Sequence, residues 1–284
     1  MNIENVPKVF QVRTNHEYPP HNTMIFEEYF LNYATVNEVN VERIYLPILW
    51  TNFYIERNYG NLEMSDLQVY LNSLDRSKTY FTVTQYDDGV LQNIDDLNIL
   101  VFGAGGGGAK KVPRKNLGYP IPLICSPSPS INKDRNRDIF CSFIGAFDRG
   151  RTRDKIKKLQ GSTGFVIKDR AKYGEFTDIM ERSVFSLCPR GYGATSFRIC
   201  ESLQRGSIPV YIYDDPWIPW KDEFEFNEIG ILVHEREVRI IPDILSYIDE
   251  GEINRYRTRG QEIYEDYFSF KGCAKQIIKK LWQQ

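Results

Sequence analysis

The sequence contains few of the residues that build metal centres or disulfide frameworks. It has three histidines and five cysteines in 284 residues, and no two cysteines show the C-x-x-C spacing. Zinc sites and disulfide-rich scaffolds depend on such clusters, so neither is expected. The cysteines lie in apolar context, which predicts buried thiols in a reducing compartment.

The sequence also lacks an excess of charge and any long apolar run. Lys and Arg number 36, Asp and Glu 38, and the formal charge is −2, which gives no general attraction to nucleic acid or anionic lipid. No apolar run approaches the ~20 residues of a membrane-spanning helix, and the first residues do not show a signal-peptide pattern. We therefore expect a soluble, cytoplasmic protein without a membrane span or a nucleic-acid partner.

The length suits two domains of about 100–150 residues each. Residues 112–138 are rich in proline and turn-forming residues, a composition that supports neither a helix nor a central strand, so the boundary is expected there. The C-terminal half then alternates short β-branched runs with helical segments, which predicts a doubly wound parallel sheet. Strands are expected at 139–145, 164–168, 184–189, 208–214 and 230–235, with helices at 152–160, 174–183 and 197–206.

The N-terminal half predicts a second, less regular α/β domain. Its expected strands are 6–12, 41–49, 80–86 and 98–103, and its expected helices are 22–34 and 65–74. Two more helices are expected near the C-terminus. The predicted domains are residues 1–130, residues 131–265, and a C-terminal helix, 266–284, that packs back on the N-terminal domain.

A glycine run, "NILVFGAGGGGAKKVP", attracts attention because it satisfies G-x-G-x-x-G through Gly103, Gly105 and Gly108. That dinucleotide-binding fingerprint requires a helix directly after the loop, whose N-terminus holds the phosphates. Pro113 and the prolines beyond it prevent such a helix. Two interpretations remain open: a mobile surface loop, or a loop bordering a ligand cleft.

A better phosphate site lies in "LCPRGYGATSFRICES", where a strand leads through a flexible turn into a helix. Free N–H groups, hydroxyls and the positive end of the helix dipole converge there, at the carboxyl end of a parallel strand. The residues expected to bind an anionic ligand are Arg190, Gly191, Gly193, Thr195, Ser196 and Arg198. Glu201 shares a helical face with Arg198, and it either forms a surface ion pair or accepts hydrogen bonds from a ribose.

These residues resemble the signature of the exostosin family, glycosyltransferase family 47. Its "C-x-P-x-G", Ser-x-Arg, acidic residue and "G-C-I-P-V" strand correspond to "LCPRG", "SFR", Glu201 and "GSIPV", with Ser207 in place of the usual Cys. The segments "FCSFIGAFDRGRTRDKI" and "YFTVTQYDDG" are also similar to family segments. The chain looks like a short soluble form, as in large DNA viruses of algae.

The resemblance implies a GT-B fold, in which two Rossmann-like domains face each other across a cleft. The C-terminal domain would bind a nucleotide sugar such as UDP-xylose, and the N-terminal domain a glycan or glycoprotein acceptor, which could be a viral capsid glycan. The implied reaction is glycosyl transfer with inversion. The sequence has no Asp-x-Asp metal signature, so neither a catalytic metal nor another cofactor is expected.

The resemblance leaves several roles to be filled. Arg149, Arg151 and Arg153 follow the 139–145 strand, and one or two of them are expected to reach the diphosphate, the alternative being a solvated helix start. The catalytic base is expected to be Asp87 or Asp88, each of which could equally cap a turn. The next candidates are His16 and His21.

Two other functions would fit parts of the sequence. A non-catalytic glycan-binding protein could keep the same fold, and it would show no hydrolysis of nucleotide sugars. A nicotinamide-dependent oxidoreductase built on the glycine run would bind the nicotinamide cofactor, which the missing helix disfavours.

Overall fold

The computed structural model describes residues 1–283 except 14–23, 38, 129–130, 133–134 and 149–150. It divides into two compact units. Unit 1 comprises Met1–Ser126 and Phe270–Gln284, and unit 2 comprises Pro127–Ser269. The division at Ser126 falls close to the boundary expected at residue 130.

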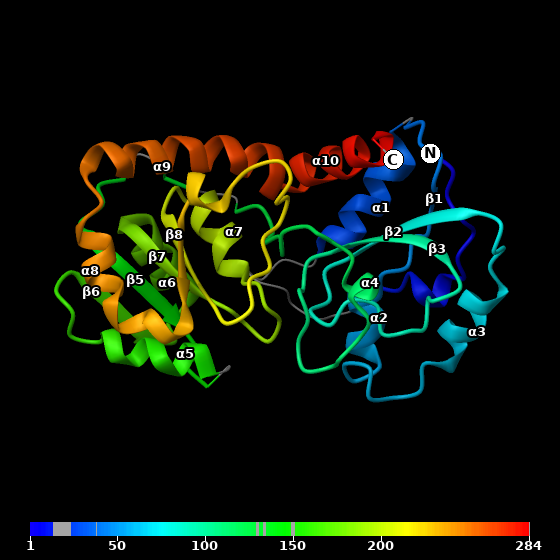
Figure 1. The fold of residues 1–284 in the computed structure, drawn as a ribbon, viewed down its shortest axis with the longest axis horizontal. Helices are drawn as coiled ribbons and strands as arrows, with labels where there is room; N and C mark the ends of the chain where they lie inside the picture. The colour runs from blue at the N-terminus through cyan, green and yellow to red at the C-terminus, as the bar shows by residue number, and fades with distance from the viewer. Residues whose placement is uncertain (14–23, 38, 129–130, 133–134, 149–150, 284) are drawn as a thin grey trace. The chain divides into compact units, whose positions relative to one another are not determined.

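Unit 1 contains a parallel sheet with the strand order β1-β2-β3-β4 (Figure 1). The central pair is in continuous register from Thr79 opposite Asn98 to Thr84 opposite Gly103. Five of the six residues of β2 are buried, as expected of a strand with helices on both faces. The strands are β1 (Ile44–Tyr45), β2 (Thr79–Thr84), β3 (Asn98–Gly103) and β4 (Tyr119–Pro120).

Helices cover this sheet, and several differ from the prediction. They are α1 (Phe26–Val36), α2 (Trp50–Glu56), α3 (Ser65–Ser73), α4 (Arg114–Leu117) and α10 (Phe270–Trp282). The strand predicted at 6–12 is wrong, because Pro7 starts a 3₁₀ turn, η1 (Lys8–Phe10), that points Phe10 into the core. The proline-rich segment contains one helical turn, α4, where no helix was expected.

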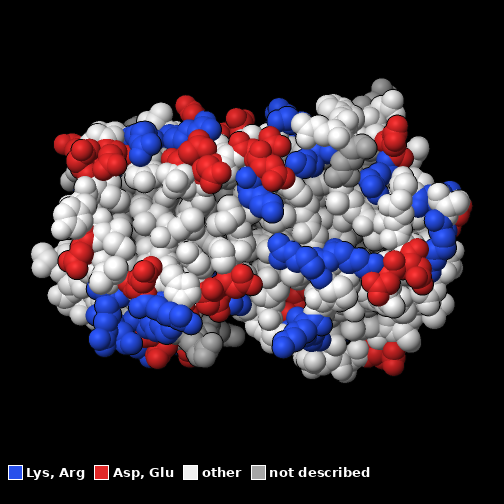
Figure 2. Space-filling view, in the orientation of Figure 1, with Lys and Arg blue, Asp and Glu red and all other residues white. Residues whose placement is uncertain are grey.

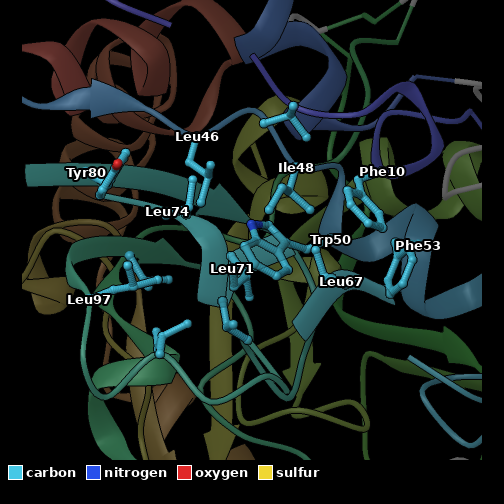
Figure 3. Close-up of a cluster of buried hydrophobic side chains, with 14 of the residues drawn as sticks. Phe10, Leu46, Ile48, Trp50, Phe53, Leu67, Leu71, Leu74, Tyr80 and Leu97 are labelled. Carbon is cyan, nitrogen blue, oxygen red and sulfur yellow. The ribbon is translucent and has the colours of Figure 1, made fainter. Parts of the chain in front are cut away.

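The core of unit 1 explains why α2 forms despite its aromatic and β-branched residues. Trp50 is fully buried at the centre of a hydrophobic cluster, close to Leu67, Leu71 and Ile48 (Figure 3). Its indole N–H donates to Thr82 Oγ1 at 2.8 Å, so the helix is held to β2 by packing and by a buried hydrogen bond. Tertiary burial therefore outweighs intrinsic propensity here.

Unit 2 contains a five-stranded parallel sheet with the order β6-β5-β7-β8-β9, which confirms the predicted doubly wound domain. The strands are β5 (Ile139–Gly145), β6 (Phe165–Asp169), β7 (Ser183–Pro189), β8 (Ile208–Tyr213) and β9 (Ile231–His234). The helices are α5 (Arg151–Ile156), α6 (Tyr173–Arg182), α7 (Phe197–Gln204), α8 (Ile241–Ser246) and α9 (Glu250–Ile263). Short 3₁₀ turns are η2 (Lys157–Leu159), η3 (Phe226–Glu228) and η4 (Glu235–Ile240).

The chain leaves unit 2 through α9 and a π-helical turn, η5 (Tyr264–Phe268), and ends in α10 as part of unit 1. The Phe270 ring packs against Phe26 and Tyr29 of α1, with ring centroids 5.7 and 5.1 Å away. The indole N–H of Trp282 donates to the Asn40 carbonyl at 2.7 Å. Both ends of α10 are thus attached to unit 1.

Candidate functional site

The turn between β7 and α7 is closed by backbone hydrogen bonds. The Gly191 N–H donates to the Thr195 carbonyl at 2.9 Å, and the Arg190 N–H donates to Ile212 at 3.0 Å. The Ser196 Oγ caps α7 by accepting from the Arg198 N–H at 3.3 Å. The strand, turn and helix start predicted from the sequence are therefore present, and Gly193, Thr195 and Ser196 are buried in the turn.

The Arg198 side chain lies at the carboxyl end of β5. Its Nε donates to Glu201 Oε2 at 3.0 Å and its Nη2 to the Ile144 carbonyl at 2.8 Å. The guanidinium also lies over the rings of Phe143 and Phe176, 5.5 and 4.6 Å from their centroids. Nη1 makes no hydrogen bond to any residue that the structure describes.

The Arg198–Glu201 pair predicted on one helical face is present, but it is not on the surface. The side chains are 16% and 9% exposed, so neither charge is well hydrated. A pair at this depth depends on good geometry to offset its desolvation. It therefore fixes the guanidinium in place more firmly than an exposed pair would.

Arg190 has a partner that the sequence reasoning missed. Its Nη1 lies 2.5 Å from Asp214 Oδ1, at the adjacent carboxyl ends of β7 and β8. Burial raises the pKa of Asp214, but the hydrogen bond from Arg190 and a backbone N–H outweigh burial and lower it overall. The Asp-Asp-Pro that follows β8 was the only signal in the sequence.

Arg153 lies close to the same turn. Its Nη2 is 3.9 Å from the position that a Cβ on Gly191 would take, which places the guanidinium beside the turn. The neighbouring Thr152 donates to Glu235 Oε2 at 2.6 Å, which ties α5 to the end of β9. Arg149 and the side chain of Arg151 lie outside the described part of the chain.

A groove of about 710 Å³ lies beside α5 in unit 2. Phe147, Asp148, Asp169 and Arg170 line it, together with Asp154 and three lysines of the α5–η2 segment. Its opposite charges largely pair with one another, as in the contact of 2.8 Å between Arg170 and Asp148. None of the predicted donor residues that the structure describes lines this groove.

In unit 1 the predicted Asp pair and the glycine run form one structure. Asp88 is fully buried, and its Oδ1 accepts from the N–H groups of Gly108 and Lys110, at 2.9 Å each. The Asp87 carbonyl accepts from the Gly107 N–H at 2.9 Å. Asp88 therefore holds the loop, and Asp87, which is partly exposed, is the better candidate for a base. His16 and His21 lie outside the described residues.

Two glycines of the run, Gly103 and Gly105, are needed for close packing, which disfavours a mobile surface loop at this point of the run. A Cβ on Gly105 would lie 2.1 Å from Asp87 Cα, and one on Gly103 would lie 1.8 Å from the Leu117 carbonyl oxygen. Gly103, Ala104 and Gly105 are buried. The run follows β3 into coil, and no helix long enough to hold a diphosphate begins there.

Glu27 is a buried carboxyl group that the sequence reasoning did not identify. It accepts hydrogen bonds from Thr51 Oγ1 at 2.6 Å, the Thr51 N–H at 3.1 Å and the Gln85 N–H at 2.7 Å. Burial raises its pKa from 4.5 to about 7, against the lowering effect of these hydrogen bonds. It joins α1 and α2 to the carboxyl end of β2.

Within the described ranges, no cluster of three or more His, Cys, Asp or Glu side chains could hold a metal ion. All five cysteines are buried, as predicted. None of the described helices is both long and apolar enough to cross a membrane.

Each unit is a parallel sheet with helices, and unit 2 carries an arginine-rich turn at its strand ends. The fold class is GT-B, as expected from the sequence. The chain belongs to the exostosin GT47 domain family, whose domain matches residues 79–248. Those residues include the Asp87–Asp88 pair and the whole of the β7–α7 turn.

Relatives match over part of their length. An exostosin-1 homolog of Caenorhabditis elegans is 31% identical over 39% of this chain and 29% of its own. A probable glucuronosyltransferase of Oryza sativa subsp. japonica is 42% identical over 44% of this chain and 31% of its own. The aligned segments thus span about three tenths of these curated relatives.

Solved structures resemble the chain loosely. The pneumococcal O-GlcNAc transferase GtfA, solved with UDP and GlcNAc, is 12% identical over 91% of this chain and 60% of that chain, with a TM-score of 0.44. The structure of TarM is 8% identical over 76% of this chain and 53% of that chain, with a TM-score of 0.45.

Proposed function

We propose that this chain is a glycosyltransferase that moves a sugar from a nucleoside diphosphate sugar to a hydroxyl group of a glycan. Unit 2 binds the donor and unit 1 the acceptor. The observation that carries the proposal is the arrangement of Arg153, Arg190 and Arg198 around the turn before α7, at the carboxyl ends of parallel strands. Guanidinium groups and a helix N-terminus are suited to a diphosphate leaving group.

The chemistry follows from these residues. The acceptor oxygen attacks the anomeric carbon, the bond to the diphosphate breaks, and the acceptor's proton passes to a base, for which we propose Asp87. Attack opposite the leaving group inverts the anomeric configuration. Negative charge develops on the diphosphate as the bond breaks, and fixed cations stabilise it without a metal ion.

The finer features of the donor and acceptor are proposed from the family resemblance. The donor is a UDP-sugar, with UDP-xylose as the first to test, and Glu201 accepts hydrogen bonds from the ribose. An acceptor on a viral capsid glycan and a cytoplasmic location remain predictions.

The first experiment is a calorimetric titration of UDP into the wild-type protein and two variants. Arg153→Ala should weaken UDP binding about tenfold or more, since a charge-assisted contact to phosphate is lost. Arg239→Ala removes an exposed arginine of the same unit, in η4, and should bind as the wild type does. No UDP binding by the wild type, or equal affinities for all three proteins, would contradict the donor site.

A second experiment distinguishes an enzyme from a glycan-binding protein. Incubation with a panel of UDP-sugars, without acceptor, should release UDP slowly for the correct donor. The Asp87→Asn variant should bind UDP normally but lose transfer to an acceptor.

A further inference from the structure

A strongly basic segment follows the glycine run in unit 1. Residues 110–115, K-K-V-P-R-K, contain four cations and no acidic residue, in a chain whose net charge is −2. Lys111, Arg114 and Lys115 are exposed. Lys and Arg side chains form a band over α4, beside a smaller group of acidic side chains (Figure 2). We call residues 110–115 the basic segment.

The basic segment is held firmly at both ends. The Lys110 N–H donates to the buried carboxylate of Asp88 at 2.9 Å. The Lys115 Nζ donates to the Ile94 carbonyl at 3.0 Å and lies 2.7 Å from Asp95 Oδ1. Lys111 forms no ion pair with any residue that the structure describes. The backbone that carries these cations is thus held at both ends, so a ligand need not order it on binding.

An exposed aromatic ring lies next to the basic segment. Tyr59 is 50% exposed, and its carbonyl accepts from Lys110 Nζ at 2.7 Å and from Tyr86 Oη at 3.2 Å. Asn58 and Tyr59 both adopt left-handed backbone conformations, with φ values of 50° and 57°. A large side chain rarely adopts this conformation, and the two hydrogen bonds to its carbonyl keep it there.

These features lie at the edge of the sheet that carries the proposed base. Tyr86 directly precedes Asp87 after β2 and donates to the Tyr59 carbonyl, and the Lys110 N–H donates to Asp88. Tyr59 and the basic segment are therefore both joined by hydrogen bonds to the segment that contains Asp87. An aromatic face suits the C–H face of a sugar ring, and cations suit a sugar that bears a negative charge.

We propose that Tyr59 and the basic segment form part of the acceptor site and select an anionic glycan. The Tyr59 ring packs against a sugar, and Lys111 and Arg114 bind its carboxylate or sulfate groups. This inference rests on the proposed function, because it assigns the surface of unit 1 to the acceptor.

The test compares three forms of one oligosaccharide: an oligogalacturonide, its neutral carboxyl-reduced form, and that neutral form after sulfation. Affinities are measured by calorimetry at two salt concentrations. The wild type should bind one or both anionic forms at least about tenfold more tightly than the neutral form, and the preference should shrink in high salt. The ratio between the two anionic forms distinguishes carboxylate from sulfate.

A pair of variants with the same charge change locates the effect. Lys111→Ala/Arg114→Ala should weaken anionic binding about five- to twentyfold and leave neutral binding unchanged. Arg76→Ala/Lys78→Ala removes the same two residue types just before β2, at the opposite end of the parallel sheet, and should have no effect. Tyr59→Ala should weaken all three forms.

Three outcomes would overturn the proposal: no preference for the anionic forms, equal losses in the two double variants, or tighter binding of a single-stranded RNA of similar charge. UDP affinity is measured in the same samples. If UDP fails to bind while the anionic preference holds, the proposed function fails separately from the assignment of this surface.

Discussion

A single oxygen of the Asp88 carboxylate accepts hydrogen bonds from the backbone N–H groups of Gly108 and Lys110, at 2.9 Å each. The two N–H groups lie about twenty residues further along the chain, and they follow β3, whereas Asp88 follows β2. One buried side chain therefore joins the carboxyl ends of two adjacent parallel strands. This contact fixes both the proposed base and the basic segment.

Removing the Asp88 carboxylate should destabilise unit 1. Asp88→Ala leaves two partly buried N–H groups without their acceptor and should lower the free energy of unfolding by roughly 3 kcal/mol. Asp88→Asn keeps one acceptor oxygen and should cost about 1 kcal/mol. Urea unfolding followed by tryptophan fluorescence measures both, since Trp50 lies in the core of unit 1.

A variant of Asp87 distinguishes the structural role of Asp88, which holds the loop, from the catalytic role proposed for Asp87. Asp87→Asn retains the backbone carbonyl that accepts from Gly107, so the unfolding free energy should change by less than about 0.5 kcal/mol while transfer activity is lost. Full transfer activity in Asp87→Asn would exclude it as the base.

The close approach of Gly105 to Asp87 leads to a further prediction. Gly105→Ala places a Cβ 2.1 Å from Asp87 Cα, so the backbone must shift, and the variant should lose at least about 2 kcal/mol of stability and also transfer activity. Gly174→Ala is the matched control, because nothing lies within 4 Å of its added Cβ in α6. A stable, active Gly105→Ala protein would show that the loop adapts freely.

Local sequence patterns predicted the strands well where one short buried run forms one strand. β5 and β3 have the same bounds as predicted, because each run is mostly apolar and ends at a glycine. The strand predicted at 41–49 is much shorter in the structure. It pairs only over Ile44–Tyr45, since Pro47 lacks an N–H and the chain then turns into α2.

The site was predictable only where its partners share an element. Arg198 and Glu201 lie one turn apart on α7, so helical periodicity was enough to pair them. The pairing of Arg190 with Asp214 depends on β7 and β8 being adjacent and in register, which a single sequence does not show. The same holds for Glu27, whose partner Gln85 is 58 residues away.

A buried ion pair in unit 2 leads to another prediction. The Arg205 Nη1 lies 2.6 Å from Glu181 Oε1, and the arginine side chain is 2% exposed. Its Nε has no hydrogen-bond partner among the described residues, so the charge is incompletely solvated by the protein. Arg205→Met alone should cost about 3–5 kcal/mol, because Glu181 loses its main partner.

The double variant Arg205→Met/Glu181→Leu should recover most of that stability, since it removes both charges and keeps similar volumes. A double-mutant cycle by urea unfolding measures the coupling. If the double variant is as unstable as the sum of the two singles, the pair contributes through something other than its mutual charge.

Glu27 predicts a pH dependence of stability whose sign is opposite to that of most carboxyl groups. Its folded pKa of about 7 lies above the 4.5 of an unperturbed glutamate, so the folded state binds the proton more tightly. The contribution to stability is complete below pH 4.5, falls as the pH rises from 4.5 to about 7, and is flat beyond. The decrease should amount to roughly 3 kcal/mol.

Glu27→Gln cannot titrate, so the difference in unfolding free energy between wild type and variant, measured from pH 4 to 8, should change over that window alone. A constant difference across the range would show that Glu27 has the same pKa in the folded and unfolded states, and that its three hydrogen bonds fully offset its burial.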